Sequence, residues 1–353
     1  MNALLQQLSK ERLDEILSRL PECTVGVVGD LGLDAYWYAD MTRSFLSRET
    51  PLFARPVVRE AYSPGAGANV ADNLKALGVG RVAVFSVLGD DWRGAILQQE
   101  MSLRGIVVEP LIISSQRSTT TFIKPILMGY DSQQEDARID FENTDPLAPE
   151  LEDALVERVT RQVTDLDALL VADQLDLNGV ITERVREALN ELAEQHADKV
   201  FVVDSRQRIG MFRHMCLKPN WVEAAAAVFP DRDPRAIPRD ELVQIGHTLG
   251  ERTGRPTFVT LSENGVIVFA DAEHRHIPIP PVRPPLDPVG AGDSFISALA
   301  ATLAAGGTPW EAGAMANLAA GVTVEKLNET GTASPAEVRA RYDLAVATMG
   351  GAG

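Results

Sequence analysis

The stretch "PPLDPVGAGDSFISALAATLAAGG", residues 284–307, places Gly290, Ala291 and Gly292 directly before Asp293 and a long helical pattern. Small residues let successive backbone N–H groups turn towards one point, and the start of a helix adds the positive end of its dipole. Such a loop suits an anion, yet it also carries a carboxylate that would repel an anion. A purely structural turn does not need this carboxylate, so we expect Asp293 to have a chemical role.

The chain around this stretch alternates short apolar runs with amphipathic helical patterns. The predicted strands are residues 24–30, 81–90, 168–173, 199–204 and 256–261, and the predicted helices lie near 69–77, 92–104, 150–165, 180–196 and 238–253. Strands this apolar, alternating with helices, are typical of a parallel sheet covered on both faces. The sequence therefore predicts an α/β fold, a three-layer α/β/α sandwich with a mainly parallel sheet. The tetrapeptide "SENG", residues 262–265, predicts a hairpin turn.

Two polar segments break the alternation, at about 35–62 and 118–142, and we predict that together they form a small β lid over the sheet. Residues 1–24 repeat apolar residues at helical spacing and predict an N-terminal helix. Residues 25–345 then form the main domain, and residues 346–353, which end in "GGAG", a flexible tail.

Composition excludes several classes of partner. The 353 residues contain 33 Lys and Arg against 50 Asp and Glu, a formal charge of −17, which disfavours binding to nucleic acid or to an anionic membrane. No apolar run is long enough to span a bilayer, and the N-terminus lacks the features of a signal peptide, so we expect a cytoplasmic protein. The two cysteines, Cys23 and Cys216, are then expected to be reduced, and the scattered histidines do not indicate zinc.

A second glycine cluster lies in "YSPGAGANVADNLKALG", residues 62–78, where Gly65 and Gly67 lead into a helix. Asn69 offers both a donor and an acceptor at the start of that helix. Alone, the pattern is typical of an ordinary turn with a helix cap. It differs from the dinucleotide-binding fingerprint because it follows an irregular segment instead of a strand and lacks the third glycine.

Together, the two glycine-rich regions resemble the signature regions of the ribokinase-like, or PfkB, carbohydrate kinases. Other pieces follow in the order of that family: "VGDLGLDAYWY" (28–38), "LKPNWVEA" (217–224), "VTLSENG" (259–265) and "ANLAAGVTVEKLNETGTASPAEV" (316–338). Within the family, "GDLGLDAYWY", "ARIDFEN" and "AAGVTVEKLNETGTAS" are most similar to the bacterial heptose-7-phosphate kinases of ADP-heptose synthesis. No nucleotidyltransferase motif follows, so we expect a free-standing kinase.

The resemblance implies a ribokinase-like fold and ATP-dependent phosphoryl transfer to a hydroxyl of a sugar or sugar phosphate, with heptose 7-phosphate as one acceptor. Asp293 would be the base that takes the proton from the hydroxyl. The N–H groups of Gly290, Ala291 and Gly292 would form an anion hole for the phosphoryl group. The carboxylate and the N–H groups then face different partners, which resolves the conflict within residues 284–307.

The resemblance also implies roles for residues in the other motifs. The expected substrate-binding residues are Asp34, Gly65, Ala66, Gly67, Asn69, Asp176 and Arg43, although Asp34 and Asp176 would also suit plain loop carboxylates. The expected nucleotide-binding residues are Asn220, Thr260, Ser262, Gly265 and Asn317. Asn220 and Glu223 would position Mg²⁺ through water, since magnesium gives up water reluctantly. Carbonyls around Asp287 and Val289 are candidates for a monovalent cation such as K⁺.

Departures from the heptose-kinase pattern fall where an acceptor would be selected. The first motif reads Gly-Ala-Gly-Ala-Asn in place of Gly-Gly-Ala-Ala-Asn, and "DQLDLNG" lacks the lysine of the corresponding loop. "DSR", residues 204–206, replaces Asp-Pro-Lys, and the lid stretch is longer. Arg43, Arg48, Lys124 and Arg206 could bind a phosphate on the sugar, or each could be a solvated charge.

Three alternatives remain open at this point. The first is a kinase of the same fold for another sugar, a keto-deoxy acid or a nucleoside, and the second is a catalytically silent sugar- or nucleotide-binding protein. A dinucleotide-dependent oxidoreductase is disfavoured by the missing third glycine. Because the edge strands of a small lid need to be covered, and related kinases pair their lids, we also expect a homodimer joined through the lid.

Overall fold

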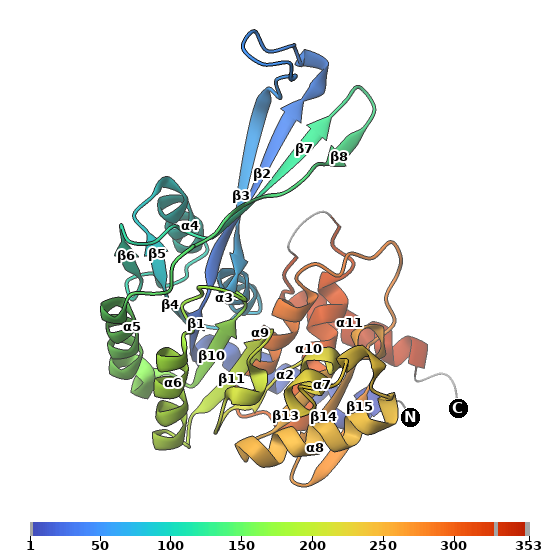
Figure 1. Ribbon diagram of the computed structural model, residues 1–353. Helices are drawn as coiled ribbons and strands as arrows, with labels where there is room; N and C mark the ends of the chain where they lie inside the picture. The colour runs from blue at the N-terminus through green and yellow to red at the C-terminus, as the bar shows by residue number, and fades with distance from the viewer. Residues whose placement is uncertain (1–2, 328–330, 350–353) are drawn as a thin grey trace.

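The computed structural model describes residues 3–327 and 331–349, and it consists of a layered body with a lid standing above it (Figure 1). The sheet of the body has the order β15-β14-β13-β12-β11-β10-β1-β4. Its strands are β1 (Thr24–Gly29), β4 (Arg81–Phe85), β10 (Ala168–Asp173), β11 (Val200–Ser205), β12 (Cys216–Leu217), β13 (Thr257–Thr260), β14 (Val266–Ala270) and β15 (Glu273–Ile277). Neighbouring strands from β4 to β13 pair in parallel, whereas β14 pairs antiparallel with both β13 and β15. The mainly parallel sheet is therefore confirmed.

Helices cover both faces of this sheet. The helices on one face are α1 (Ala3–Gln7), α2 (Lys10–Arg19), α3 (Gly67–Ala76), α9 (Ala291–Ala304), α10 (Pro309–Thr323) and α11 (Pro335–Met349); those on the other are α5 (Pro149–Gln162), α6 (Glu183–Gln195), α7 (Trp221–Val228) and α8 (Leu242–Thr253). Successive strand residues point to opposite faces, so Val82 and Val84 join the first core while Ala83 and Phe85 join the second. The predicted three layers follow directly from this alternation of apolar side chains.

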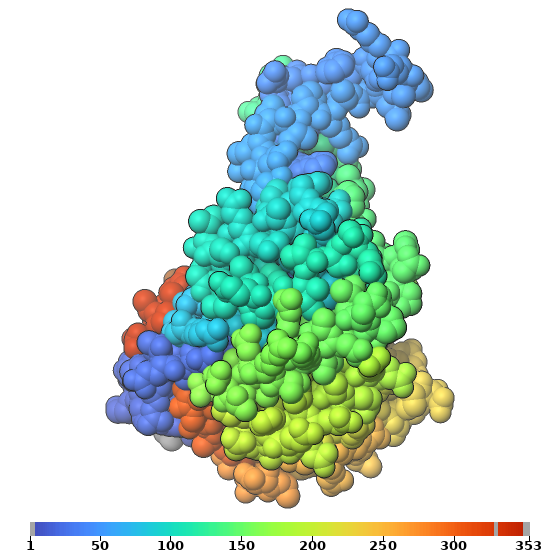
Figure 2. All heavy atoms as spheres, turned by 90° about the vertical axis from the view of Figure 1, so that its left-hand side faces the viewer, coloured from blue at the N-terminus to red at the C-terminus, as the bar shows by residue number. Residues whose placement is uncertain are grey.

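The lid is a second sheet, which projects from one edge of the body (Figures 1 and 2). Its strands are β2 (Leu31–Asp40), β3 (Val57–Ala66), β7 (Thr121–Met128), β8 (Gln133–Glu135) and β9 (Ile139–Phe141). They lie in the order β3-β2-β7-β8, and β9 also pairs with β7. Strands β2 and β3 run deep into the body, so Gly65 and Ala66 end a long strand. The expectation that the glycine cluster of residues 62–78 follows an irregular segment is therefore wrong.

The strand predicted over 81–90 is also divided. It leaves the main sheet at Ser86, whose hydroxyl is buried and donates to the carbonyl of Gly29 (2.7 Å). The next residues form β5 (Val87–Gly89), which pairs in parallel with β6 (Ile112–Ser114) beside α4 (Trp92–Leu103). A pattern of apolar residues cannot show this change of partner, because both partners are distant in the chain.

Helix boundaries differ from the predicted ones at three places. Residues 1–24 contain two helices, since Ser9 accepts a hydrogen bond from the N–H of Arg12 (3.2 Å) and caps α2. Helix α8 begins at Leu242, and residues 346–349 continue α11 instead of starting a tail; residues 350–353 lie outside the described part. The 3₁₀ helices are Leu20–Glu22, Met41–Arg43, Val163–Asp165, Ile209–Met211, Pro234–Ala236, Arg239–Glu241 and Ser262–Asn264. The last of these makes the predicted hairpin turn between β13 and β14.

Both cysteines are free and buried among the described residues, as the sequence predicts. Burial raises the pKa of Cys23 to about 11 and that of Cys216 to about 12, so both stay as unreactive thiols. None of the described helices is long and apolar enough to cross a lipid bilayer.

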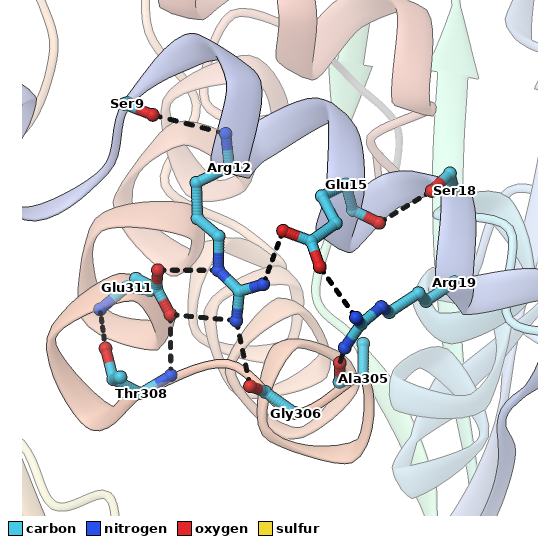
Figure 3. Close-up of polar contacts among 9 residues, drawn as sticks. All are labelled: Ser9, Arg12, Glu15, Ser18, Arg19, Ala305, Gly306, Thr308 and Glu311. Atoms are coloured by element: carbon cyan, nitrogen blue, oxygen red, sulfur yellow. Dashed lines mark hydrogen bonds and ion pairs between the residues drawn. The ribbon is translucent and has the colours of Figure 1, made fainter.

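Helix α2 is tied to the connection between α9 and α10 (Figure 3). Arg12 Nε contacts Glu311 Oε1 at 2.7 Å, and Arg12 Nη2 donates to the carbonyl of Gly306 at 2.9 Å. Arg19 Nη1 reaches the carbonyl of Ala305, at 3.3 Å. These contacts, called the N-terminal clamp, bind the carbonyls of Ala305 and Gly306, which directly follow the end of α9. The clamp therefore holds the C-terminal end of α9, the helix that carries Asp293 in its first turn.

We expect Arg12→Ala to lower the free energy of unfolding by roughly 1–2 kcal/mol, since one partly buried side chain supplies both an ion pair and a carbonyl contact. Urea denaturation followed by circular dichroism measures this change. The matched control is Arg161→Ala, which removes an exposed pair with Glu157 on α5 and should cost less than about 0.5 kcal/mol. Equal losses in the two variants would show that the clamp adds nothing to an ordinary surface ion pair.

Candidate active site

Asp293 lies where three distant segments of the chain meet. Gly290 adopts a left-handed conformation, with a φ of +77°, and α9 starts directly after it, so Asp293 is the third residue of the helix. Its Oδ2 accepts a hydrogen bond from Asn69 Nδ2 on α3 (2.6 Å), and its Oδ1 accepts one from Gln174 Nε2 just after β10 (3.2 Å). The carboxylate is thus held in one orientation from both sides.

Its surroundings make this carboxylate unusually basic. Burial raises the pKa of Asp293 to about 6, the hydrogen bond from Asn69 opposes the rise, and the nearby Asp204 adds to it. Gln174 and Lys218 favour the charged form. A carboxylate with a pKa near 6 is ionised at neutral pH and still takes a proton more readily than an ordinary aspartate, which suits a general base.

A cavity of about 430 Å³ opens in front of Asp293. It is lined by Asp34, Gly65, Ala66, Asn69, Phe122, Lys124, Arg138, Gln174, Leu175, Asp204, Arg206, Lys218, Asn220, Glu223, Thr260, Val289, Gly290, Gly292 and Asp293. These residues come from the lid, from loops that follow strands of the main sheet, and from the start of α9. Polar groups that converge from several elements are typical of a ligand site at the carboxyl ends of parallel strands.

The lid brings Asp34 to this cavity. Asp34 on β2 is buried and forms an ion pair with Lys124 Nζ on β7 (3.2 Å), which also contacts the Tyr36 hydroxyl (3.2 Å). Burial lowers the pKa of Lys124, but Asp34 and Tyr36 outweigh it and hold the pKa above its ordinary value. A Cβ at Gly65 would lie 3.1 Å from Asp34 Oδ1, so a larger residue would crowd the carboxylate. Gly67 is buried at the start of α3 and does not line the cavity.

Asn220 and Glu223 have a structural role in addition to any role towards a metal. Asn220 Oδ1 accepts from the N–H groups of Val222 and Glu223, at 2.9 Å each, and Glu223 Oε2 accepts from the Asn220 N–H (2.7 Å). This is a capping box at the start of α7. It uses one of the two carboxylate oxygens of Glu223, and both residues line the cavity.

The donor set fits magnesium only if other ligands share the ion. The described residues contain no group of three or more His, Cys, Asp or Glu side chains that could hold a metal. Mg²⁺ keeps several waters and is commonly bound by one or two carboxylates together with substrate phosphates. Glu223 and Asn220 fit that mode of binding, in which the nucleotide supplies the remaining ligands.

Lys218 is a residue of the site that the sequence analysis missed. Its side chain is 5% exposed, and its Nζ lies 3.2 Å from Asp204 Oδ1. Burial lowers the pKa of Lys218, but Asp204 and Glu223 outweigh that effect and keep the pKa above its usual value. A buried cation therefore lies close to Asp293. Its position in "LKPN", just before Asn220, was the available signal, but a lysine there predicts no burial.

A second cavity, of about 470 Å³, lies on the other side of the start of α9 and shares Thr260 and Gly292 with the first. It is lined by Thr260, Ser262, Glu263, Gly265, Ile279, Val282, Leu286, Pro288, Ala291, Gly292, Phe295, Asn317, Ala320, Gly321 and Val324. Four of the five predicted nucleotide-binding residues are in this set. Asn317 Nδ2 donates to the carbonyls of Ile277 (2.8 Å) and Pro278 (3.2 Å) and so fixes one wall. The many apolar side chains suit a flat heteroaromatic ring.

Besides Gly67, two other predicted substrate residues do not line the first cavity. The loop after β10 places Asp176 on its exposed side, where its carbonyl accepts from Arg208 Nη1 (3.2 Å), and Gln174 points to Asp293 instead. Arg43 is exposed in the 3₁₀ turn that follows β2, towards the end of the lid, and Arg48 is exposed beyond it. Neither Asp176 nor Arg43 lines this cavity, and their contact with a substrate stays a prediction.

Arg138, within "ARIDFEN", lines the cavity instead. Arg138 bonds both oxygens of Asp140 at 2.6 Å and lies over the ring of Phe122, 4.6 Å from its centre. Arg206, one of the four basic residues considered for a phosphate on the sugar, lines the cavity as well.

Asp287 and Val289 line a third cavity, of about 380 Å³, beneath the lid. The other lining residues are Tyr36, Tyr38, Lys124, Ile126, Gln133 and Glu135. The N–H of Val289 donates to Asp287 Oδ1 (3.0 Å), which closes a turn directly before Gly290.

Sequence comparison agrees with this geometry. Residues 55–337 match the family model described as pfkB family carbohydrate kinase. The bifunctional protein HldE of Trichlorobacter lovleyi is 33% identical over 341 residues, which cover 96% of this chain and 66% of that protein. The HldE protein of Geobacter sulfurreducens is 33% identical over 336 residues, covering 94% and 65%. The chain thus spans slightly less than two thirds of the length of these relatives.

Solved structures share the fold. The ribokinase from Thermotoga maritima superposes with a TM-score of 0.64 at 21% identity, over 91% of this chain and 99% of that one. Phosphofructokinase-2 from Escherichia coli, in complex with potassium, superposes with a TM-score of 0.69 at 17% identity, over 92% and 99%. The predicted ribokinase-like arrangement of a large sheet and a small β lid is confirmed.

We expect Lys218→Met to lower the free energy of unfolding at pH 8 by about 2–4 kcal/mol, because Asp204 loses its buried partner. The pKa of Asp293, already about 6, rises further without this cation. At pH 5, below this raised pKa, Asp293 of the folded variant is protonated, whereas at pH 8 it is ionised. Proton binding to the folded state at pH 5 offsets part of the lost interaction, so the loss of stability is smaller there. Urea denaturation at both pH values measures the difference.

Lys10→Met, which removes a surface pair with Asp343, is the control and should cost less than about 1 kcal/mol at either pH. An equal loss at pH 5 and pH 8 would argue against a charged Lys218.

Proposed function

The chain belongs to the PfkB family of carbohydrate kinases, and we propose that it transfers the γ-phosphoryl group of ATP to a hydroxyl of a sugar phosphate, with heptose 7-phosphate as the favoured acceptor. One observation carries the proposal: Asp293 and the start of α9 lie where a polar cavity and a mainly apolar cavity meet. The polar cavity suits the acceptor, and the apolar cavity suits the base of the nucleotide.

In this proposal, Asp293 accepts the proton of the acceptor hydroxyl as its oxygen attacks the γ-phosphorus in line. The bond between the γ-phosphorus and the bridging oxygen breaks, and ADP leaves with that oxygen. The N–H groups at the start of α9 face the charge that develops on the phosphoryl oxygens, and Lys218 adds a fixed positive charge. Mg²⁺ held beside Glu223 and Asn220 would neutralise part of the nucleotide charge.

An anionic acceptor is supported by the basic side chains around the cavity. Lys124, Arg138, Arg206 and Lys218 all line it. Three of them have carboxylate partners, whereas Arg206 forms no ion pair with the described residues and is our first candidate to bind an acceptor phosphate. Among sugar phosphates, the resemblance of "GDLGLDAYWY" and "ARIDFEN" to heptose-7-phosphate kinases favours heptose 7-phosphate.

A second candidate is the same reaction on another acceptor, such as a neutral sugar, a keto-deoxy acid or a nucleoside. Residues that depart from the heptose-kinase pattern, including Gln174 and Arg206, line the acceptor cavity itself. For a monovalent cation, we propose the turn at Asp287 and Val289, and the E. coli phosphofructokinase-2 crystallised with potassium supports testing K⁺.

The test is ADP release from Mg-ATP across a panel of sugars and sugar phosphates that includes heptose 7-phosphate. We expect turnover with the heptose phosphate, and Asp293→Asn should lower kcat about 10²–10⁴-fold while nucleotide binding persists. Asp90→Asn, at an exposed carboxylate after β5, is the control. Turnover with a neutral sugar alone would support the proposed phosphoryl transfer but show that heptose 7-phosphate is not the acceptor. Full activity in Asp293→Asn would remove the assigned base.

We further propose a homodimer joined through the lid. The described residues at the lid tip expose Phe45 (60%) and Phe53 (67%) together with Leu46 and Leu52. Figure 2 shows this part of the chain standing clear of the body. Exposed apolar groups beside an unpaired strand edge favour pairing with a second copy.

We expect Phe45→Ser combined with Phe53→Ser to shift the mass measured by light scattering from dimer towards monomer, since both changes remove apolar area from the joint. Leu103→Ser, at an exposed position at the end of α4, should leave the mass unchanged. A monomeric wild-type protein at working concentration would refute the lid dimer.

A further inference from the structure

The loop from Gln174 to Val180 is held by a buried carboxylate on the neighbouring strand. Asp30 follows β1, which pairs in parallel with β10, and it is 2% exposed. Its Oδ2 accepts the N–H groups of Gln174 and Leu175, at 2.9 Å each, and its Oδ1 accepts the N–H of Val180 at 2.7 Å. One side chain therefore binds both ends of the loop.

The carbonyls of the same loop are bound from the other side. Arg208 donates to the carbonyl of Leu175 (2.8 Å) and to that of Asp176 (3.2 Å), and Asp173 holds Arg208 through its Nε (3.0 Å). Arg117 Nη2 donates to the carbonyl of Asn178 at 2.6 Å. Three N–H groups and three carbonyls of the loop backbone are thus bound by neighbouring side chains, which restricts movement of the loop.

The backbone of the loop approaches the Asp30 carboxylate closely at Gly179. A Cβ at Gly179 would lie 2.6 Å from Asp30 Oδ1 and 2.9 Å from Asp30 Oδ2. Any side chain at this position would push the loop away from the carboxylate. Glycine therefore permits the contact that Asp30 makes with Val180.

We infer that Asp30 is a positioning residue for the reaction: it holds the loop so that the Gln174 side chain reaches Asp293. The inference rests on the proposed role of Asp293 as the base. The N–H of Gln174 is bound by Asp30, and its side chain donates to Asp293 Oδ1 at 3.2 Å, so one residue links the two carboxylates. Holding a loop does not by itself require a buried charge, which is costly; three N–H donors that converge on one point match a carboxylate better than any neutral side chain.

The test is a double-mutant cycle on the wild-type chain with Asp30→Asn and Gln174→Ala, measured as ADP release. Each single change should lower kcat by about tenfold, as expected when one hydrogen bond to a charged group is lost, with the KM for ATP unchanged. The double variant should be no more than about twofold slower than either single variant, because both changes remove the same contact. Asp90→Asn is the matched control, with an exposed carboxylate at the end of a strand.

Three outcomes would overturn the inference: an unchanged kcat in Asp30→Asn, losses that multiply in the double variant, or a KM for ATP that rises as kcat falls. If Asp30→Asn does not fold, Gly179→Ala replaces it in the cycle, since it disturbs the same contact from the loop. Asp293→Asn separates the two claims. If Asp293→Asn abolishes turnover while Gln174→Ala has no effect, the positioning role of Asp30 is wrong and the proposed function stands. If Asp293→Asn stays fully active, the proposed role of Asp293 as the base is wrong.

Discussion

The proposed base, Asp293, has to be ionised in a place where burial disfavours its charge, and several groups around it favour the charged form. Two amide side chains, from Asn69 and Gln174, donate to its oxygens, and the buried ammonium of Lys218 lies nearby. The positive end of α9 favours the same charge. Each of these groups comes from a different part of the chain, so the basicity of one carboxylate depends on the packing of α3, α9 and the loops that follow β10 and β12.

The start of α9 also lies at the boundary between the two cavities. The start of α9 separates a space with many charged side chains from one lined mainly by apolar groups, and only Thr260 and Gly292 border both. A small residue at the boundary lets ligands on either side approach closely, while the adjacent helix keeps the two spaces distinct. The polar side can therefore vary in its contacts with an acceptor without changing the apolar side.

The main sheet could be predicted because its strands, such as residues 168–173, are apolar on both faces and carry their own signal. The division at Ser86 could not, because it depends on a hydrogen bond to Gly29. Within the site, Asp293 could be predicted from the sequence because Gly290 and Gly292 directly precede it. The difference between Asp176 and Gln174 was not, because Asp30, far away in the chain, sets the direction of that loop.

Another residue of the site shows the same limit. Lys218 is recognisable as important only once its buried partner Asp204 is placed beside it. Asn220 and Glu223, by contrast, had a readable local signal, since their spacing is that of a capping box as well as of a metal-binding pair. A local pattern can thus be detected and still leave its purpose undecided between helix capping and ligand binding.

The N-terminal clamp also has a consequence for the order in which the molecule is completed during synthesis. Arg12 emerges from the ribosome 299 residues before its partner Glu311. Likewise, the carbonyl of Leu8 accepts a hydrogen bond from the hydroxyl of Tyr342 (3.0 Å), which is synthesised much later. Contacts between such distant residues form late, because the intervening chain must first be made and arranged. Helices α1 and α2 are therefore made well before they reach their final packing, and α9 acquires its full support only after Glu311 has been synthesised.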